Sequence, residues 1–190
     1  IYRITVENDY TTLLEFQPSK ALDFRAYHVS RFGNVNNAFT VANRDDTSHY
    51  DNGLNTLQEV YCYQVKVENA CGKFSDTLLV PSHCTVESKA KGEVNQVRVN
   101  WNAYRGWPVQ KYRVYREERN QVGSYILLDS VDGATLEYVD TGVYCDAIHY
   151  YRVEAVENGG FSKASFSDTC AAKPVYLNVV PPNHLTRATV

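Results

Sequence analysis

The sequence contains no methionine, and none of its apolar runs approaches the ~20 residues that a membrane-spanning helix needs. The sequence has no excess of basic charge either. It contains 19 lysine and arginine residues and 22 aspartate and glutamate residues, which gives a net charge of −3. This balance excludes the broad basic face with which proteins bind nucleic acid. We therefore expect no nucleic acid among the partners and no insertion into a membrane. A chain that opens at Ile1 is expected to be a mature product or a piece of a longer protein.

The motifs of common enzymes and metal sites are missing as well. There is no Gly-x-Ser-x-Gly turn, no His-Glu-x-x-His, no phosphate-binding glycine loop and no Cys-x-x-Cys pair. Two carboxylate clusters, Asp45-Asp46 with Asp51 and Asp129 with Asp132, fit calcium or acid–base chemistry on one interpretation and turn chemistry on the other. We favour turn chemistry. The chain is expected to be non-catalytic and to carry no cofactor or metal.

The residues that are abundant favour β-strands. The chain holds 15 tyrosines and 7 phenylalanines, with many valines and threonines. Residues 96–101 alternate, so that Val97, Val99 and Trp101 share one face, and residues 61–67 alternate in the same way. Asn52-Gly53 and Asp132-Gly133 mark tight turns between such segments. These features predict an all-β protein built from antiparallel β-sandwiches.

The same signals occur twice, with an offset of between 85 and 92 residues. Five anchor motifs recur in the same order, and the offset changes only in the stretches between them, where loops accept insertions. The corresponding residues are Phe16 and Trp101, Tyr27 and Tyr112, Arg31 and Arg116, Asp51 and Asp140, Tyr63 and Tyr151, and Phe74 and Phe166. The repeat predicts two homologous domains, at 1–83 and 84–174. Residues 175–190 follow as a linker or as the first strand of another domain, and the alternation in Val175-Tyr176-Leu177 favours a strand.

The pattern resembles fibronectin type III domains. The second domain contains the marker motifs of that family in order. They are a strand that ends in Trp101, a Tyr-x-Val-x-Arg motif that begins at Tyr112, a turn with Asp140, and a Tyr-x-Val motif that begins at Tyr151. In the first domain Phe16 stands in place of the tryptophan. The resemblance implies that six aromatic residues mark the cores, namely Phe16, Tyr27 and Tyr63 in the first domain and Trp101, Tyr112 and Tyr151 in the second. It implies a fold and brings no catalytic residues with it.

A narrower resemblance concerns the location. The run from Tyr61 to Asp76, Tyr-Cys-Tyr-Gln-Val-Lys-Val-Glu-Asn-Ala-Cys-Gly-Lys-Phe-Ser-Asp, is similar to fibronectin-type repeats in very long surface proteins of Bacteroidota, which are exported by the type IX system and often associated with gliding motility. In such proteins the repeats form stalks. The resemblance implies an extracellular or cell-surface location.

Five cysteines are compatible with that location, because structural disulfides persist in oxidising compartments. In the first domain Cys62 begins the expected sixth strand and Cys84 ends the seventh, and in the second Cys145 precedes the sixth strand and Cys170 lies in the seventh. These places favour the pairs Cys62–Cys84 and Cys145–Cys170, which leaves Cys71 as a free thiol at a hairpin tip. A rival pairing of Cys71 with Cys84 would leave Cys62 free. Sequence alone does not choose between these connectivities.

One loop is a candidate binding surface. Tyr104 and Trp107 lie between the second and third strands of the second domain, where exposed rings would suit a sugar or a partner protein. The alternative, which we favour, is that Trp107 folds back over the sandwich or against the first domain.

Taken together, these features predict a non-catalytic spacer or interaction segment of a large secreted or cell-surface bacterial protein. Its partners would be neighbouring domains of the same chain, and a surface protein or glycan in the case of an adhesin. An alternative is a pair of accessory, carbohydrate-binding modules of a secreted enzyme whose catalytic domain lies elsewhere.

Overall fold

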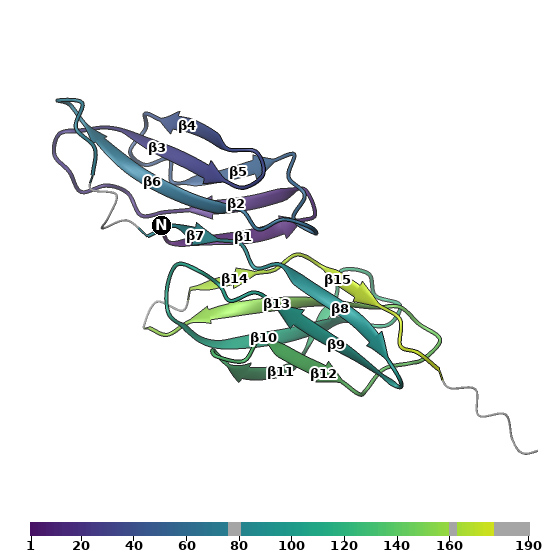
Figure 1. Cartoon of the computed structure of the whole chain (residues 1–190). Coiled ribbons are helices and arrows are strands. Elements are labelled where there is room, and N and C mark those ends of the chain that lie inside the picture. Colours follow the sequence, from purple (N-terminus) through teal and green to yellow (C-terminus); the bar gives the residue numbers. More distant parts are fainter. Residues whose placement is uncertain (76–80, 160–162, 177–190) are drawn as a thin grey trace, which may run out of the picture.

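The computed structural model of the protein describes residues 1–75, 81–159 and 163–176. Within these ranges the chain is all-β and forms two antiparallel β-sandwiches that follow each other in sequence (Figure 1). We call residues 1–85 module one and residues 86–176 module two. The described residues form no helix that is long and apolar enough to cross a membrane.

Each module places a sheet of three strands against a larger sheet. In module one the sheets have the orders β1-β2-β5 and β4-β3-β6-β7, and in module two the orders β12-β9-β8 and β11-β10-β13-β14, with β15 also pairing with β13. The strands of module one are β1 (Arg3–Asn8), β2 (Thr11–Glu15), β3 (Phe24–Phe32), β4 (Asn37–Val41), β5 (Ser48–Asn52), β6 (Cys62–Asn69) and β7 (His83–Cys84). Those of module two are β8 (Ser88–Glu93), β9 (Gln96–Trp101), β10 (Val109–Glu117), β11 (Tyr125–Asp132), β12 (Glu137–Asp140), β13 (His149–Glu157), β14 (Ala164–Phe166) and β15 (Cys170–Ala172). This is the immunoglobulin-like sandwich that fibronectin type III domains share.

The period-two alternation of the strands fills the space between the sheets. On β9, Val97 and Val99 are fully buried and Trp101 is nearly so, whereas Asn100 between them is exposed. All six predicted core aromatics are buried, three in each of two separate hydrophobic clusters. Phe16 and Trp101 therefore fill equivalent places in the two cores.

The sequence repeat is visible as a repeated side-chain network. In module one Asp51 accepts hydrogen bonds from Arg31 and from the hydroxyl of Tyr63, at 2.8 and 2.9 Å. In module two Asp140 accepts hydrogen bonds from Arg116 and from the hydroxyl of Tyr151. The serine of the repeated Phe-Ser-Asp motif provides a second match. Ser75 exchanges two hydrogen bonds with the backbone of Val67, and Ser167 does so with the backbone of Val153.

The boundary between the modules lies slightly later than position 83. Cys84 belongs to β7 and pairs with Cys62 on β6, and the N–H of Thr85 donates to the carbonyl of Tyr61 in module one. Val86 is the first residue buried in the second core. At the other end Val175, expected in a linker or a third domain, bridges to Val94 of module two. The rest of that prediction, residues 177–190, lies outside the described part of the chain.

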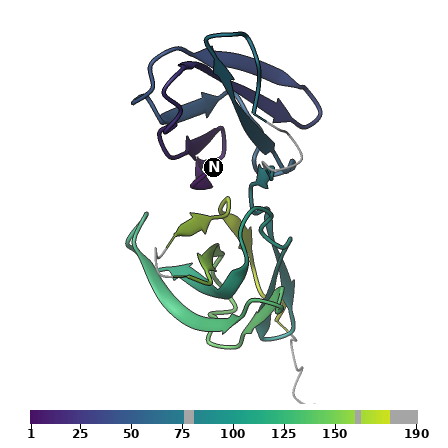
Figure 2. The same ribbon diagram turned by 90° about the vertical axis from the view of Figure 1, so that its left-hand side faces the viewer.

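The two modules meet along their edges. Figures 1 and 2 show β1, at the edge of module one, lying next to β14, at the edge of module two, with the N-terminus close to the seam between them. The strand orders agree, since β1 and β14 each end a sheet. The modules therefore form a contiguous pair rather than two units separated by an extended linker.

Candidate functional site

The loop that the sequence offered as a binding surface is part of the junction between the modules. Tyr104 is only 5% exposed and Trp107 only 7%, and their rings lie 4.1 Å apart between centroids. The indole N–H of Trp107 donates to the carbonyl of Tyr2 in module one at 3.1 Å. An exposed platform at this loop is therefore wrong. The rings pack into the core of module two and contact module one at its edge, which is the alternative favoured from the sequence.

His83 is also buried at this junction, beside Tyr104. Its Nδ1 lies 2.9 Å from the hydroxyl of Tyr104, and that hydroxyl also accepts a hydrogen bond from the N–H of Ile4. Burial lowers the pKa of His83 to about 3, so its imidazole is neutral at physiological pH. Gly106 has a φ of +151°, and a Cβ there would lie 2.3 Å from Nδ1 of His83. Glycine is required at this position because the ring occupies the space of a side chain.

The facing edge strands are joined by side-chain to backbone hydrogen bonds. An edge strand carries unpaired N–H and C=O groups that must be covered or solvated. Ser165 on β14 donates its hydroxyl to the carbonyl of Ile4 on β1, and the N–H of Phe166 donates to the hydroxyl of Thr5 at 2.9 Å. Ile4, Thr5 and Ser165 are buried, and Phe166 is half-buried. These bonds define the relative position of the two sheets along the seam.

A disulfide lies beside the same junction. The structure joins Cys62 and Cys84, which are directly opposed on β6 and β7. The N–H of Cys84 donates to the carbonyl of Arg105 in module two at 2.9 Å. The bridge therefore anchors the strand that leads from one module into the other.

The second predicted disulfide, Cys145 with Cys170, is wrong, and the strand register explains why. Tyr63 pairs with His83 in module one, and the equivalent Tyr151 pairs with Cys170 in module two. Cys170 in module two is therefore equivalent to His83 in module one. It lies one residue before the position that is equivalent to Cys84, where the disulfide would form. Because side chains alternate between faces, a shift of one residue turns the thiol into the core. Cys145 lies before β13, where its thiol is 3.6 Å from Asn95.

The three remaining thiols differ in accessibility. Cys71 is exposed, as expected for the hairpin tip, Cys145 is half-buried and Cys170 is buried. Burial raises the pKa of the Cys170 thiol to about 12. The rival bridge from Cys71 to Cys84 is not formed.

The carboxylate clusters act in turns and core networks. Asp132 accepts a hydrogen bond from the N–H of Ala134, and Asp129 accepts one from its neighbour Ser130. Asp51 is bound by Arg31 and Tyr63. Within the described ranges, no group of three or more histidine, cysteine, aspartate or glutamate side chains is placed to hold a metal ion.

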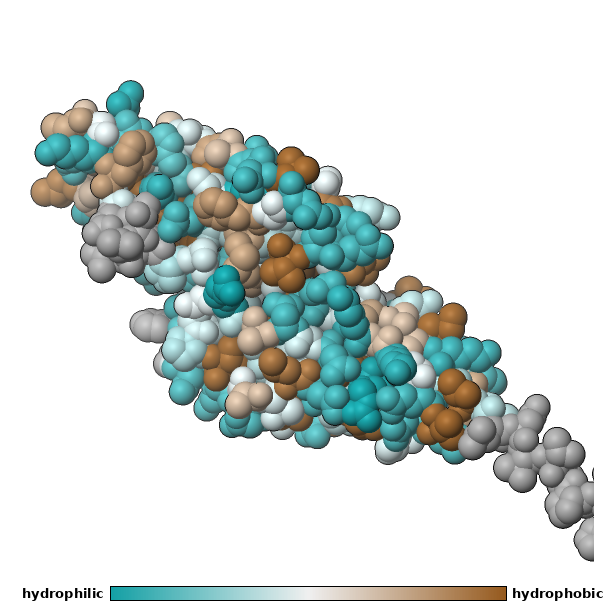
Figure 3. Space-filling view, viewed as in Figure 1, coloured by the Kyte–Doolittle hydropathy of each residue, from teal (hydrophilic) through white to brown (hydrophobic). Residues whose placement is uncertain are grey.

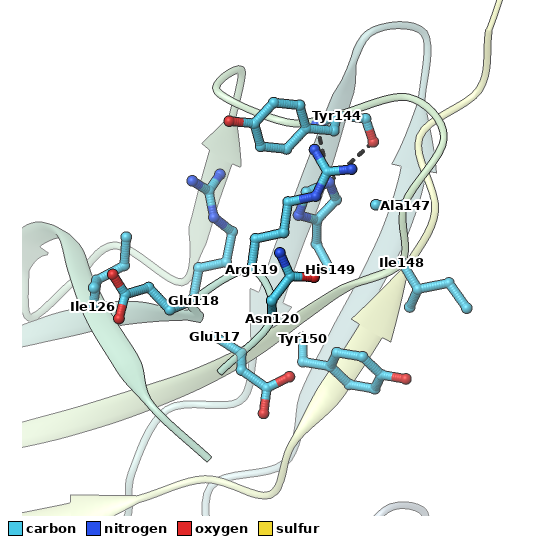
Figure 4. A pocket seen from close by; sticks show the side chains of 11 residues that line it. Glu117, Glu118, Arg119, Asn120, Ile126, Tyr144, Ala147, Ile148, His149 and Tyr150 are labelled. Atoms are coloured by element: carbon cyan, nitrogen blue, oxygen red, sulfur yellow. Dashed lines mark hydrogen bonds between the residues drawn. The ribbon is translucent and has the colours of Figure 1, made fainter. Parts of the chain in front are cut away.

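One cavity with room for a ligand lies within module two. It has a volume of about 550 Å³ and is lined by residues 116–120 at the end of β10 and just after it, by Ile126, and by Tyr144 with residues 147–150 before and at the start of β13 (Figure 4). The guanidinium of Arg119 lies over the ring of Tyr144, 4.6 Å from its centroid. His149 is buried and accepts a hydrogen bond from the N–H of Tyr144 at 3.0 Å, which holds the tyrosine loop against β13.

Sequence reasoning missed this cavity because its residues come from strand ends and from the loops beside them, which the alternation of buried positions does not connect. The two segments are about 30 residues apart and meet only because β10 and β13 are antiparallel neighbours. The usable signal is the pair of tyrosines at 144 and 150, one in the loop before β13 and one on β13. Both are exposed, at 51% and 41%.

Comparison with known proteins finds similar solved structures but no related sequence. No family model and no curated protein matches the sequence. Similar solved structures include a two-domain fibronectin type III segment of chicken tenascin, 19% identical over 90% of this chain and 94% of that one, with a TM-score of 0.38. A fibronectin-like protein from Clostridium thermocellum is 23% identical over 52% of this chain and 96% of that one, with a TM-score of 0.34.

A third similar structure is the pectate lyase Pel3 from Pectobacterium carotovorum. It is 16% identical over 51% of this chain, with a TM-score of 0.42. The match spans only 29% of the lyase.

Proposed function

We propose that the chain is a rigid, non-catalytic two-module unit that fixes the relative position of whatever parts of a longer protein precede and follow it. The observation that carries the proposal is the junction, where Trp107 and Tyr104 are buried against module one and β14 is bonded to β1. Modules joined by a flexible linker bury little surface between them. Here a small movement would break several buried hydrogen bonds at once.

The location that we propose is the outside of a bacterial cell. The disulfide between Cys62 and Cys84 supports an oxidising compartment. The finer assignment, to the stalk of a long Bacteroidota surface protein exported by the type IX system, is supported by the sequence resemblance of the run from Tyr61 to Asp76. Strand β8 lies at the edge of its sheet, and Lys89 and Lys91 on it are exposed. Charged side chains on an edge strand discourage pairing with a strand of another molecule, as a solvent-exposed edge requires.

The test is whether the modules tumble as one body. In the wild-type chain, nitrogen-15 relaxation should give one overall correlation time for the amides of both modules. Replacing Tyr104 with Phe and Ser165 with Ala should separate the correlation times, because both hydroxyls bond to Ile4 across the seam. Tyr125→Phe removes a hydroxyl that lies near Thr169 within module two and should leave one common time. Independent tumbling of the wild-type modules would refute the proposal.

A further inference from the structure

The cavity of module two has the size of a small-ligand site. Its volume of about 550 Å³ falls within the range of pockets that enclose a drug-sized or sugar-sized molecule. A protein partner would bind a larger and flatter apolar area. The face seen in Figure 3 shows hydrophilic residues interspersed with separate hydrophobic ones and no broad apolar area. We therefore consider which small molecule the cavity fits.

Its charges are balanced and largely used within the protein. Arg116 is bound to Asp140 at 2.6 Å, and Arg119 lies over Tyr144 and 4.0 Å from Asp146. Arg116 is therefore held by a buried carboxylate, whereas Arg119 has only an exposed carboxylate 4.0 Å away and lies against a tyrosine ring. The two adjacent glutamates bring the net charge of the four charged lining residues to zero. The cavity does not favour a phosphate or an acidic sugar.

Unused hydrogen-bonding capacity remains at its rim. Glu117 accepts through Oε1 from the N–H of Gly123, and Glu118 accepts through Oε2 from Ser124, so each carboxylate keeps a second oxygen for a ligand. Asn120 at the loop tip is exposed and brings an amide that both donates and accepts. Carboxylates and amides together match the hydroxyl groups of a polyol.

Two aromatic rings complete the surface. Tyr144 is 51% exposed although Arg119 covers one side, and Tyr150 on β13 is 41% exposed. Figure 4 shows Tyr144 above the cavity and Tyr150 below it, with Arg119 and Asn120 between them. The face of a tyrosine ring carries negative charge density, so it attracts the weakly positive C–H groups on the face of a pyranose.

From these features we propose that module two binds a neutral saccharide, with Tyr144 and Tyr150 contacting pyranose faces and Glu117, Glu118 and Asn120 bonding to hydroxyls. The site is contained in module two and lies at the ends of β10 and β13 that are distant from the Trp107 loop. It therefore does not depend on the rigidity of the junction, and tumbling measurements and saccharide titrations can succeed or fail separately.

The experiment is a nuclear magnetic resonance titration of the full chain with cellohexaose, xylohexaose, mannohexaose and laminarihexaose, and with trigalacturonate as the anionic comparator. We expect at least one neutral oligosaccharide to shift amides in residues 116–120 and 144–150. Tyr144→Ala and Tyr150→Ala should each weaken binding about tenfold. Tyr10→Ala, which removes an exposed tyrosine from module one, should leave the affinity unchanged.

Three results would overturn the proposal. The first is the absence of any shift with all four neutral oligosaccharides at their solubility limits. The second is a response to trigalacturonate alone, which would mean that the site selects anions. The third is binding that survives both tyrosine substitutions, which would locate the site elsewhere. The amide spectra of the variants report whether module two remains folded, so a loss of binding is not confused with unfolding.

Discussion

The hydroxyl of Tyr151 donates a hydrogen bond of 2.9 Å to Oδ2 of Asp140, and the same oxygen lies 2.6 Å from the guanidinium of Arg116. Asp140 is 3% exposed, and its other oxygen accepts the N–H of Gly142. This carboxylate therefore joins three parts of module two, the strands β10 and β13 and the turn after β12. Asp51 plays the same part in module one, with Arg31 and Tyr63.

Replacing either aspartate with alanine should unfold its own module at a lower denaturant concentration. Each change leaves an arginine that is mostly buried without its carboxylate, since the side chains of Arg31 and Arg116 are only 11% and 16% exposed. We expect a loss of about 3 kcal/mol in each case. Urea unfolding followed by resolved amide signals of each module measures it. Asp129→Ala, which removes only an exposed local contact, is the control and should change stability by less than about 0.5 kcal/mol. Equal effects of Asp129→Ala and Asp140→Ala would contradict the role of the network.

His83 should make the stability of the chain depend on acidity. Its folded pKa of about 3 lies below the ~6.5 of an unfolded chain, so between these values the unfolded state binds a proton that the folded state does not. Stability is therefore complete above pH 6.5 and decreases as the pH falls toward 3. At pH 5 the loss should be about 2 kcal/mol relative to pH 7. The free energy of unfolding of His83→Phe should lack this part of the pH dependence. Parallel curves for the variant and the wild type would show that His83 does not titrate in this way.

Asp168 should act in the opposite direction over part of the same range. It is 1% exposed and accepts hydrogen bonds through Oδ1 from the N–H and hydroxyl of Ser88, and burial raises its pKa to about 6. Here the folded state binds the proton more tightly than the unfolded state. Its contribution is therefore complete below pH 4 and is lost as the pH rises through 6.

The matching variant is Asp168→Asn, which keeps an oxygen for Ser88 and cannot ionise. Relative to the wild type, we expect it to gain about 2 kcal/mol in stability as the pH rises from 4 to 7. Thermal unfolding at several pH values measures the difference. A constant difference across the range would mean that Asp168 is not protonated near pH 6.

The sandwich was predictable because its determinants are local. Phe16, Tyr63 and Trp101 stand in alternating segments, and alternation by itself places them in a core. The junction was only partly predictable, because the partner of Trp107 is a backbone carbonyl 105 residues earlier in the chain. No periodic pattern encodes such a contact. The favoured interpretation of that loop was correct because a tryptophan and a tyrosine close together are more stable covered than exposed.

The error at the cysteines has a different origin. Strand membership can be inferred from sequence to within one or two residues, and that precision suffices for a fold but not for a disulfide. In module two an error of a single position separates Cys170 from the site of the bridge. The cavity around Tyr144 was missed for a third reason, since strand ends and the loops beside them carry no periodic signal by which they could be brought together.

The thiols provide a direct check of this register. A small alkylating reagent applied to the native chain should modify Cys71 quickly, Cys145 more slowly and Cys170 only after unfolding, because Cys170 is buried and its thiol pKa is raised to about 12. Intact mass and peptide mapping identify the modified positions. Modification of Cys71 alone after complete denaturation would reveal a bridge between Cys145 and Cys170 and would contradict the structure.

The register also predicts where module two could accept the disulfide that it lacks. Because Tyr63 and Tyr151 are equivalent, the positions that correspond to Cys62 and Cys84 are Tyr150 and Ala171, which are directly opposed on β13 and β15. The double variant Tyr150→Cys with Ala171→Cys should form a bridge on air oxidation and stabilise module two by about 3 kcal/mol, in proportion to the loop it closes. Reduction should remove the gain, and Tyr150→Cys alone should show none. A double variant that stays reduced, or that pairs instead with Cys170, would mean that β15 is out of register by one residue, and the equivalence of the two modules would then end at β13.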